Sequence, residues 1–148
     1  MLDIDASSKK RLFEQIGLLF ENHNRLARAA VFDSLFAREK LGSTGLGYGV
    51  AIPHGRIKNL RETICAFVRP QVPIPFEAPD GLPVKLVFAM LAPEHATDQH
   101  LHILSELAQM FSDADFREAL EHEKDPVLAH RMLTEWSPYA TTKRTAAL

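Results

Sequence analysis

Hydrophobic residues recur every three or four positions near the N-terminus, which is the spacing of an amphipathic helix. The pattern predicts a first helix from a serine cap at Ser7 or Ser8 to about His23. A second helix is predicted from a cap at Asn24 to a stop at Gly42. The apolar positions that define these two helices are Leu12, Ile16, Leu19, Phe20, Val31 and Leu35.

Continuous apolar runs in the middle of the chain predict β-strands. Residues 84–91 form the strongest candidate, and their nearly unbroken apolar character is typical of a strand buried on both faces. Residues 63–68, and residues 50–52 up to Pro53, predict two further strands. We expect residues 73–76 to form a strand edge or a loop, because proline cannot donate a hydrogen bond to a sheet ladder.

Helical spacing returns in the last third of the chain. It predicts a helix over residues 98–111, capped by Thr97, and two shorter helices that begin at Ser112 or Asp113 and at Asp125. Helices at both ends with strands between them indicate an α/β domain whose helices pack on a central sheet.

The length of 148 residues suits one compact domain, which we assign to residues 1–136, followed by a flexible polar tail over residues 137–148. No apolar stretch approaches the roughly 20 residues of a membrane span, and the N-terminus lacks an export signal. We therefore expect a cytoplasmic protein. The net charge of −2 offers no basic field for nucleic acid or anionic lipid. Cys65 lies in an apolar run and is expected to be an inert core thiol.

Five of the seven glycines lie within fourteen residues, mostly between the second helix and the first predicted strand. Glycine permits positive φ, and successive exposed N–H groups can hold an anion. A flexible connector is the alternative. Neither a P-loop nor a Rossmann fingerprint fits, since no Gly-Lys-Ser/Thr follows and the glycines precede the strand. The candidate phosphate-binding residues here are Ser43, Thr44, Gly45, Gly47 and Gly55.

His54 follows the first predicted strand in a Pro-His-Gly sequence. Pro53 fixes its own φ, which helps to orient the next residue, and Gly55 leaves the space beside His54 uncrowded. An imidazole at a strand end is poorly placed for a core and suits proton or phosphoryl transfer near neutral pH. His54 is therefore the candidate reactive residue, and an exposed loop histidine is the alternative.

A second group of histidines precedes or opens the helix predicted over residues 98–111. If Thr97 is the cap, His100 lies in the first turn, where backbone N–H groups and the helix dipole favour an anion. His100 shares a stripe with the apolar residues Leu104, Leu107 and Phe111. His102 lies on the other side of the helix and should face water. A capping or partly buried histidine is the alternative for His100.

Arg38 lies on the buried stripe of the second helix, just before the glycine-rich segment. Its guanidinium offers a planar fork to phosphate oxygens. A favourable charge at a helix C-terminus is the alternative. The neighbouring Glu39 and Lys40 are expected to be solvated.

A metal site is not indicated by the spacing of the histidines. Ligands on one helix need i,i+3 or i,i+4 spacing, which His100 and His102 lack. No cysteine pair or Glu–His motif completes a ligand set. A metal-dependent hydrolase is therefore the weakest of the functional alternatives.

Residues 38–55 read Arg-Glu-Lys-Leu-Gly-Ser-Thr-Gly-Leu-Gly-Tyr-Gly-Val-Ala-Ile-Pro-His-Gly. This segment resembles the active-site signature of the enzyme IIA proteins of the fructose/mannitol class, in the bacterial phosphoenolpyruvate-dependent phosphotransferase system. Its first eight residues are most similar to the nitrogen-regulatory branch. The similarity extends to residues 100–104 and covers residues 5–135.

The resemblance implies a mixed sheet flanked by helices, as in mannitol-type IIA proteins. It implies that His54 is phosphorylated by a phosphohistidine of a small histidine phosphocarrier protein (nitrogen-type HPr). His100 would be the second active-site histidine, and Arg38 would help to hold the phosphoryl group. No metal or nucleotide cofactor is then required.

No sugar-transporter or IIB domain accompanies this one, so we expect a regulatory carrier that signals through its phosphorylation state in nitrogen or potassium regulation. The alternative is a binding protein that acts on ion transporters or sensor kinases independently of phosphorylation. A charged phosphoryl group on a binding face could also combine the two roles.

Overall fold

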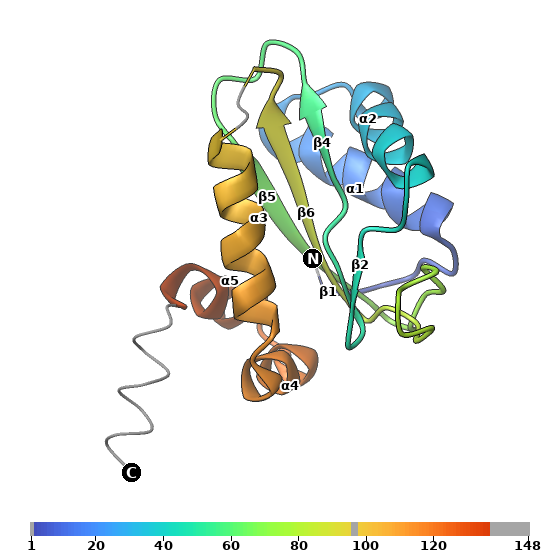
Figure 1. The fold of residues 1–148 in the computed structure, drawn as a ribbon, viewed down its shortest axis with the longest axis vertical. Helices are drawn as coiled ribbons and strands as arrows, with labels where there is room; N and C mark the ends of the chain where they lie inside the picture. The colour runs from blue at the N-terminus through green and yellow to red at the C-terminus, as the bar shows by residue number, and fades with distance from the viewer. Residues whose placement is uncertain (1, 96–97, 137–148) are drawn as a thin grey trace. The chain divides into compact units, whose positions relative to one another are not determined.

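The computed structural model describes residues 2–95 and 98–136 (Figure 1). The elements of the N-terminal part are β1 (Leu2–Ile4), α1 (Lys9–Asn24), α2 (Arg28–Lys40), β2 (Gly45–Gly47), β3 (Val50–Ala51), β4 (His54–Ile57), β5 (Ile64–Pro70) and β6 (Leu86–Pro93). Those that follow are α3 (Asp98–Phe111), α4 (Ala114–His122) and α5 (Pro126–Glu135). By their internal contacts the residues form two compact units, Met1–His100 and Leu101–Leu148, which we describe separately.

The first unit contains a mixed sheet with the strand order β1-β5-β6-β3-β2, in which β4 also pairs with β6. The pairs β1/β5, β3/β6 and β4/β6 are parallel, and the pairs β2/β3 and β5/β6 are antiparallel. The predicted α/β class with a central mixed sheet is thereby confirmed. Three short strands, β1, β2 and β4, were not predicted.

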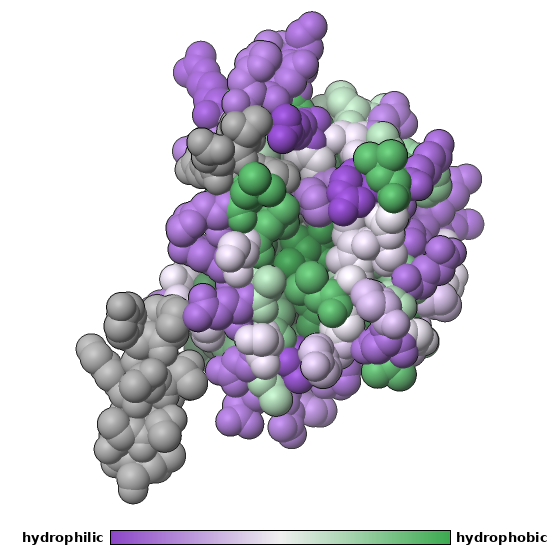
Figure 2. All heavy atoms as spheres, in the orientation of Figure 1, coloured by the Kyte–Doolittle hydropathy of each residue, from purple (hydrophilic) through white to green (hydrophobic). Residues whose placement is uncertain are grey.

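Helices α1 and α2 pack against each other and against this sheet (Figure 1). Their inward stripes merge with sheet residues into one apolar core. Fully buried members of this core include Phe13, Ile16, Leu35, Val87 and Leu91. Figure 2 shows hydrophilic side chains along the edge of the molecule where Figure 1 draws the two helices. The amphipathic spacing read from the sequence therefore identified the inward faces.

Strand β6 is the centre of the sheet, and the predicted burial on both faces is confirmed. Six of its eight residues are buried, and the exceptions, Phe88 and Pro93, are half-buried. Residues 73–76 form only one isolated bridge, between Ile74 and Val84, as the prolines predict. Cys65 on β5 is exposed, so its predicted place in the core is wrong. Partial desolvation of its sulfur by neighbouring groups still raises the pKa of the thiol to about 11, which fits an inert thiol.

The junction between α1 and α2 differs from the prediction. Ser8 caps α1 as expected, with its Oγ accepting a bond of 3.2 Å from the Arg11 N–H. However, α2 starts at Arg28, not after a cap at Asn24. The Glu21 carboxylate, on the last turns of α1, accepts a bond from the Arg28 backbone N–H at 3.0 Å and from its guanidinium at 2.9 Å. A side chain seven residues upstream thus replaces the local cap.

The second unit, over its described residues, consists of the greater part of α3 with α4 and α5. Asp113 caps α4 and Asp125 caps α5, as predicted. The Phe116 ring lies 6.3 Å from that of Phe111 and 6.4 Å from that of Trp136, which ties the three helices together. The predicted cap Thr97 and the predicted tail over residues 137–148 lie outside the described residues. No described helix is long and apolar enough to cross a membrane.

Candidate functional site

His54 is the first residue of β4, after an interruption in the sheet. Strand β3 ends at Ala51 and β4 begins at His54, and both pair in parallel with β6. Across the interruption the Pro53 carbonyl accepts a bond of 2.9 Å from the Met90 N–H. The half-buried imidazole is therefore carried by a strand paired with the central strand β6, not by the free turn that the sequence suggested.

The orientation of the His54 ring is set by its own backbone. Its Nδ1 lies 2.7 Å from the carbonyl oxygen of Ile52. A carbonyl can only accept a hydrogen bond, so Nδ1 carries the proton of the neutral imidazole. Nε2 then carries the lone pair, which makes it the nucleophilic nitrogen of the ring.

The surroundings of His54 keep the imidazole neutral. Burial lowers its pKa below the ordinary value, and the nearby positive charge of Arg38 lowers it further. The Ile52 carbonyl and the Glu39 carboxylate act in the opposite direction, and the lowering effects are larger. The charges of Arg38, a predicted site residue, and of Glu39, which was not among them, therefore both act on His54.

Arg38 occupies the last turn of α2 and is half-buried. Its Nη1 donates a bond of 2.9 Å to the carbonyl oxygen of Gly42. This bond holds the guanidinium at the end of the helix and leaves the planar fork with further N–H donors. Arg38 can therefore present positive charge and donors to an anion close to His54.

Glu39 is buried, with 8% of its surface exposed, so its predicted solvation is wrong. Its Oε1 accepts bonds from Lys9 Nζ at 2.8 Å and from the Thr44 N–H at 3.1 Å. Its Oε2 accepts a bond of 2.6 Å from Thr44 Oγ1. The buried stripe of α2 runs through Val31, Leu35 and Glu39 at spacings of four, and Arg38 lies beside it. That spacing was the signal in the sequence that could have identified Glu39.

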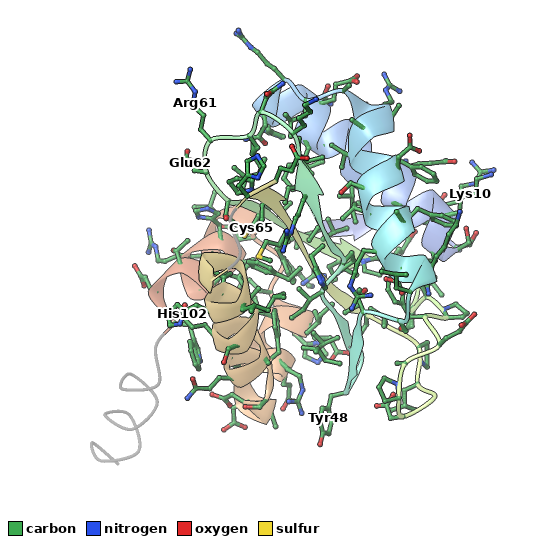
Figure 3. The ribbon with its side chains drawn as sticks, turned by 45° about the horizontal axis from the view of Figure 1, so that its top comes forward. Lys10, Tyr48, Arg61, Glu62, Cys65 and His102 are labelled. Atoms are coloured by element: carbon green, nitrogen blue, oxygen red, sulfur yellow. The ribbon has the colours of Figure 1, made fainter. Side chains whose placement is uncertain are left out.

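Half of the predicted glycine-rich loop is a β-hairpin. Strands β2 and β3 pair from Gly45 to Ala51 around a two-residue turn at Tyr48-Gly49. Both turn residues have positive φ, 58° and 78°, as a type I′ turn requires. The Tyr48 N–H donates a bond of 2.8 Å to the carboxylate of Asp80, and Figure 3 shows the Tyr48 side chain pointing outward from the hairpin tip.

The predicted phosphate-binding residues therefore fall in different places. Gly47, at the hairpin tip, lies beside the Asp80 carboxylate, which already supplies an anion there. The Ser43 hydroxyl donates to the Phe76 carbonyl at 2.6 Å and accepts from the Gly45 N–H at 3.1 Å. Both polar hydrogens of Thr44 bind Glu39, as described above. These groups hold the loop in shape.

Gly55 follows His54 in β4 and faces α2. A Cβ at this position would overlap the Ser34 side chain and lie 3.1 Å from the Ser34 carbonyl carbon. Ser34 Oγ also donates a bond of 2.9 Å to the Arg56 carbonyl. Glycine here permits the close approach of β4 to α2, and that approach places the His54 strand beside the helix that carries Arg38.

The side chain of one of the two histidines of α3 is described by the structure, and that of the other is not. His102 is exposed, and its Nε2 lies 3.0 Å from Glu106 Oε1, so its predicted solvent-facing position is confirmed. The side chain of His100 lies outside the described residues, although its backbone belongs to α3. Within the part of the chain that the structure describes, no three His, Cys, Asp or Glu side chains are grouped to hold a metal ion.

Comparisons with known proteins agree on one family. Residues 1–136 match the family model described as phosphoenolpyruvate-dependent sugar phosphotransferase system, EIIA 2. A nitrogen regulatory protein of Pseudomonas aeruginosa is 42% identical over 121 residues, which cover 81% of this chain and 79% of the relative. The resemblance read from residues 38–55 is thereby confirmed.

Solved structures give the same result. The crystal structure of nitrogen regulatory protein IIA-Ntr from Neisseria meningitidis is 52% identical, with a TM-score of 0.84, and covers 89% of this chain and 90% of that one. IIA mannitol from Escherichia coli, at 23% identity, shares the fold with a TM-score of 0.73, covering 88% and 92% of the two chains.

Proposed function

Because the chain belongs to the EIIA 2 family of the phosphoenolpyruvate-dependent sugar phosphotransferase system, we propose that it carries a phosphoryl group on Nε2 of His54. The observation that carries this proposal is the 2.7 Å bond between Nδ1 and the Ile52 carbonyl. It assigns the ring proton to one nitrogen and the lone pair to the other. The lowered pKa of His54 supports the same role, since only a neutral imidazole can attack phosphorus.

The transfer is a displacement between two imidazoles. The Nε2 lone pair of His54 attacks the phosphorus of the donor phosphohistidine in line with the N–P bond that breaks. The electron pair of that bond returns to the donor ring, which leaves as a neutral imidazole when its other nitrogen is protonated. The positive charge that develops on His54 is stabilised by the Ile52 carbonyl on Nδ1–H and by the nearby carboxylate of Glu39.

Arg38 supplies the charge for the phosphoryl oxygens. Its guanidinium is held by Gly42 close to His54 and retains further donors for oxygen atoms. Transfer of this kind depends mostly on positioning and on stabilising charge. His100 is the proposed second donor, by its resemblance to the family pattern. No metal or nucleotide enters this mechanism.

The donor that fits this chemistry is a small phosphocarrier protein with a phosphohistidine, of the nitrogen-type HPr class. The relatives named nitrogen regulatory proteins support a regulatory role in preference to a direct role in sugar uptake. The phosphoryl group adds about two negative charges at a half-buried point, which is enough to change what a partner recognises there. Ion transporters and sensor kinases are the proposed targets.

The test is a phosphotransfer assay on the purified protein. Incubation with phosphoenolpyruvate, enzyme I and the phosphocarrier should add one acid-labile phosphoryl group to the intact mass. His54→Ala should add none. His102→Gln is the matched control, because His102 is exposed and bound to Glu106, and it should behave as wild type. Uptake retained in His54→Ala would refute the proposal.

A regulator that works without phosphorylation is the competing function, and a pull-down separates the two. Wild type, His54→Ala and His54→Asp are compared for binding to candidate transporters or kinases. Binding that differs between the phosphorylated wild type and His54→Ala supports the carrier. Equal binding by all forms favours the competing function.

A further inference from the structure

Glu39 joins the start of α1 to the segment that follows α2. From the end of α2 its carboxylate binds Lys9 at the start of α1 and both polar hydrogens of Thr44. Lys9 Nζ also donates to the Phe76 carbonyl at 3.2 Å and lies 4.6 Å from the centre of the Phe76 ring. A charge this deeply buried is stable only when its partners are in place, so Glu39 fixes their geometry.

From Thr44 a chain of backbone hydrogen bonds leads to His54. The Thr44 carbonyl accepts a bond of 3.0 Å from the Ile52 N–H. The carbonyl of the same Ile52 holds Nδ1 of His54 at 2.7 Å. The position of Thr44 therefore helps to fix the peptide units of Ile52. The Ile52 carbonyl in turn determines which ring nitrogen of His54 carries the proton.

The anchor of Arg38 depends on Glu39 as well. The backbone carbonyl of Glu39 accepts a bond of 3.1 Å from the Gly42 N–H. The Gly42 carbonyl in turn accepts the bond from Arg38 Nη1. One residue, through its side chain and its backbone, thus supports both groups of the proposed phosphoryl site.

We propose that Glu39 is a positioning residue for phosphoryl transfer, which holds the Thr44 and Ile52 peptides so that His54 keeps its proton on Nδ1. The inference rests on the proposed function of His54. Glu39 itself does not touch the phosphoryl group. If the Ile52 carbonyl shifts, the Nδ1 bond weakens and the tautomer with the proton on Nε2 becomes populated. That tautomer has no lone pair on Nε2 and cannot accept a phosphoryl group there.

The decisive variant is Glu39→Gln, which keeps the shape of the side chain and removes its charge. The amide nitrogen cannot accept, so the side chain loses bonds to Lys9 or Thr44. ¹⁵N NMR of the His54 ring should show a larger share of the Nε2–H tautomer. The rate of transfer from the phosphocarrier should fall roughly ten- to a hundredfold, with little change in KM for the donor.

Two further variants control this result. Glu21→Gln removes a carboxylate that likewise pairs with a basic side chain, here Arg28, but lies at the α1–α2 junction, and it should leave the tautomer and the rate unchanged. Thr44→Val removes only the hydroxyl bond to Glu39, at nearly constant volume, and should shift the tautomer in the same direction. It keeps the proposal testable if Glu39→Gln does not fold.

Wild-type tautomer ratios and rates in folded Glu39→Gln and Thr44→Val would overturn the positioning role. The proposed function is tested separately, by phosphoryl uptake in the wild type. A tautomer shift in a protein that accepts no phosphoryl group would support the positioning of His54 and refute the function.

Discussion

Lys9 Nζ lies 2.8 Å from Glu39 Oε1, so that a cation at the start of one helix neutralises a buried carboxylate at the end of the next. The pair is unequal in burial, because the Glu39 side chain is 4% exposed and that of Lys9 is 21% exposed. Burial of the carboxylate makes the pair sensitive to the loss of either member.

Lys9→Met should lower the free energy of unfolding by about 2–4 kcal/mol, because it leaves the Glu39 charge without its cation. The double variant Lys9→Met/Glu39→Gln should be more stable than the sum of the single effects predicts, since no buried charge remains. Urea denaturation of the four proteins measures both quantities. If the two single effects on the free energy of unfolding simply add in the double variant, the interaction between Lys9 and Glu39 does not contribute to stability.

Phosphoryl uptake should persist at pH values below the ordinary pKa of histidine, about 6.5. Burial and Arg38 lower the pKa of His54 in the folded protein, so the ring stays neutral until the pH falls to that lower value. An NMR titration of His54 alongside the initial rate of uptake measures both. A rate that already halves near pH 6.5 would contradict this prediction.

The same pKa shift makes folding depend on pH. The unfolded chain binds a proton at His54 near pH 6.5, whereas the folded protein binds it only at lower pH. This residue therefore reduces stability as the pH falls from about 6.5 to the folded pKa, and adds no further loss below it. Urea unfolding of wild type and His54→Ala across this range measures the effect. The difference between their free energies of unfolding should change with pH in that window alone.

Arg38→Lys should slow phosphoryl transfer by roughly ten- to a hundredfold, because an ammonium keeps the charge and loses the planar fork. The pKa of His54 should remain lowered, since the positive charge is retained. Arg61→Lys is the matched control, because Arg61 is exposed in the loop before β5 (Figure 3). Equal transfer rates for Arg38→Lys and wild type would indicate that only charge is needed.

Gly55→Ala should destabilise the protein by about 1–3 kcal/mol, because the new methyl group overlaps Ser34 of α2. It should also slow transfer, since separating β4 from α2 moves His54 away from Arg38. In the background Ser34→Ala the same substitution should cost less, because the hydroxyl that it meets has been removed. Thermal melts of the four proteins test this coupling.

The sequence alone predicted the elements whose signals are local. Ser8, Asp113 and Asp125 cap helices through N–H groups two or three residues away, so a short window contains the signal. The apolar run of β6 is of the same kind. His54 and Arg38 became candidates because each is a chemically distinctive residue where a predicted helix or strand ends.

The features that were missed depend on partners distant in sequence. The Glu21 cap of α2 and the Lys9–Glu39 pair join residues seven and thirty positions apart. Strand β4 has the sequence His-Gly-Arg-Ile, whose pattern carries no strand signal, and it exists because β6 offers it a parallel partner. Three-dimensional proximity decides such features, and periodicity does not encode it.

The interruption between β3 and β4 has a wider consequence. In an unbroken strand the Ile52 carbonyl would belong to the ladder, as nearly every backbone acceptor within a sheet does. Here Ile52 lies between the end of β3 and the start of β4, and its carbonyl accepts a hydrogen bond from the imidazole instead. The proton of the His54 ring is thus assigned to one nitrogen by a backbone carbonyl that is left without a partner strand. Because this acceptor is a main-chain atom, no substitution of a side chain removes it.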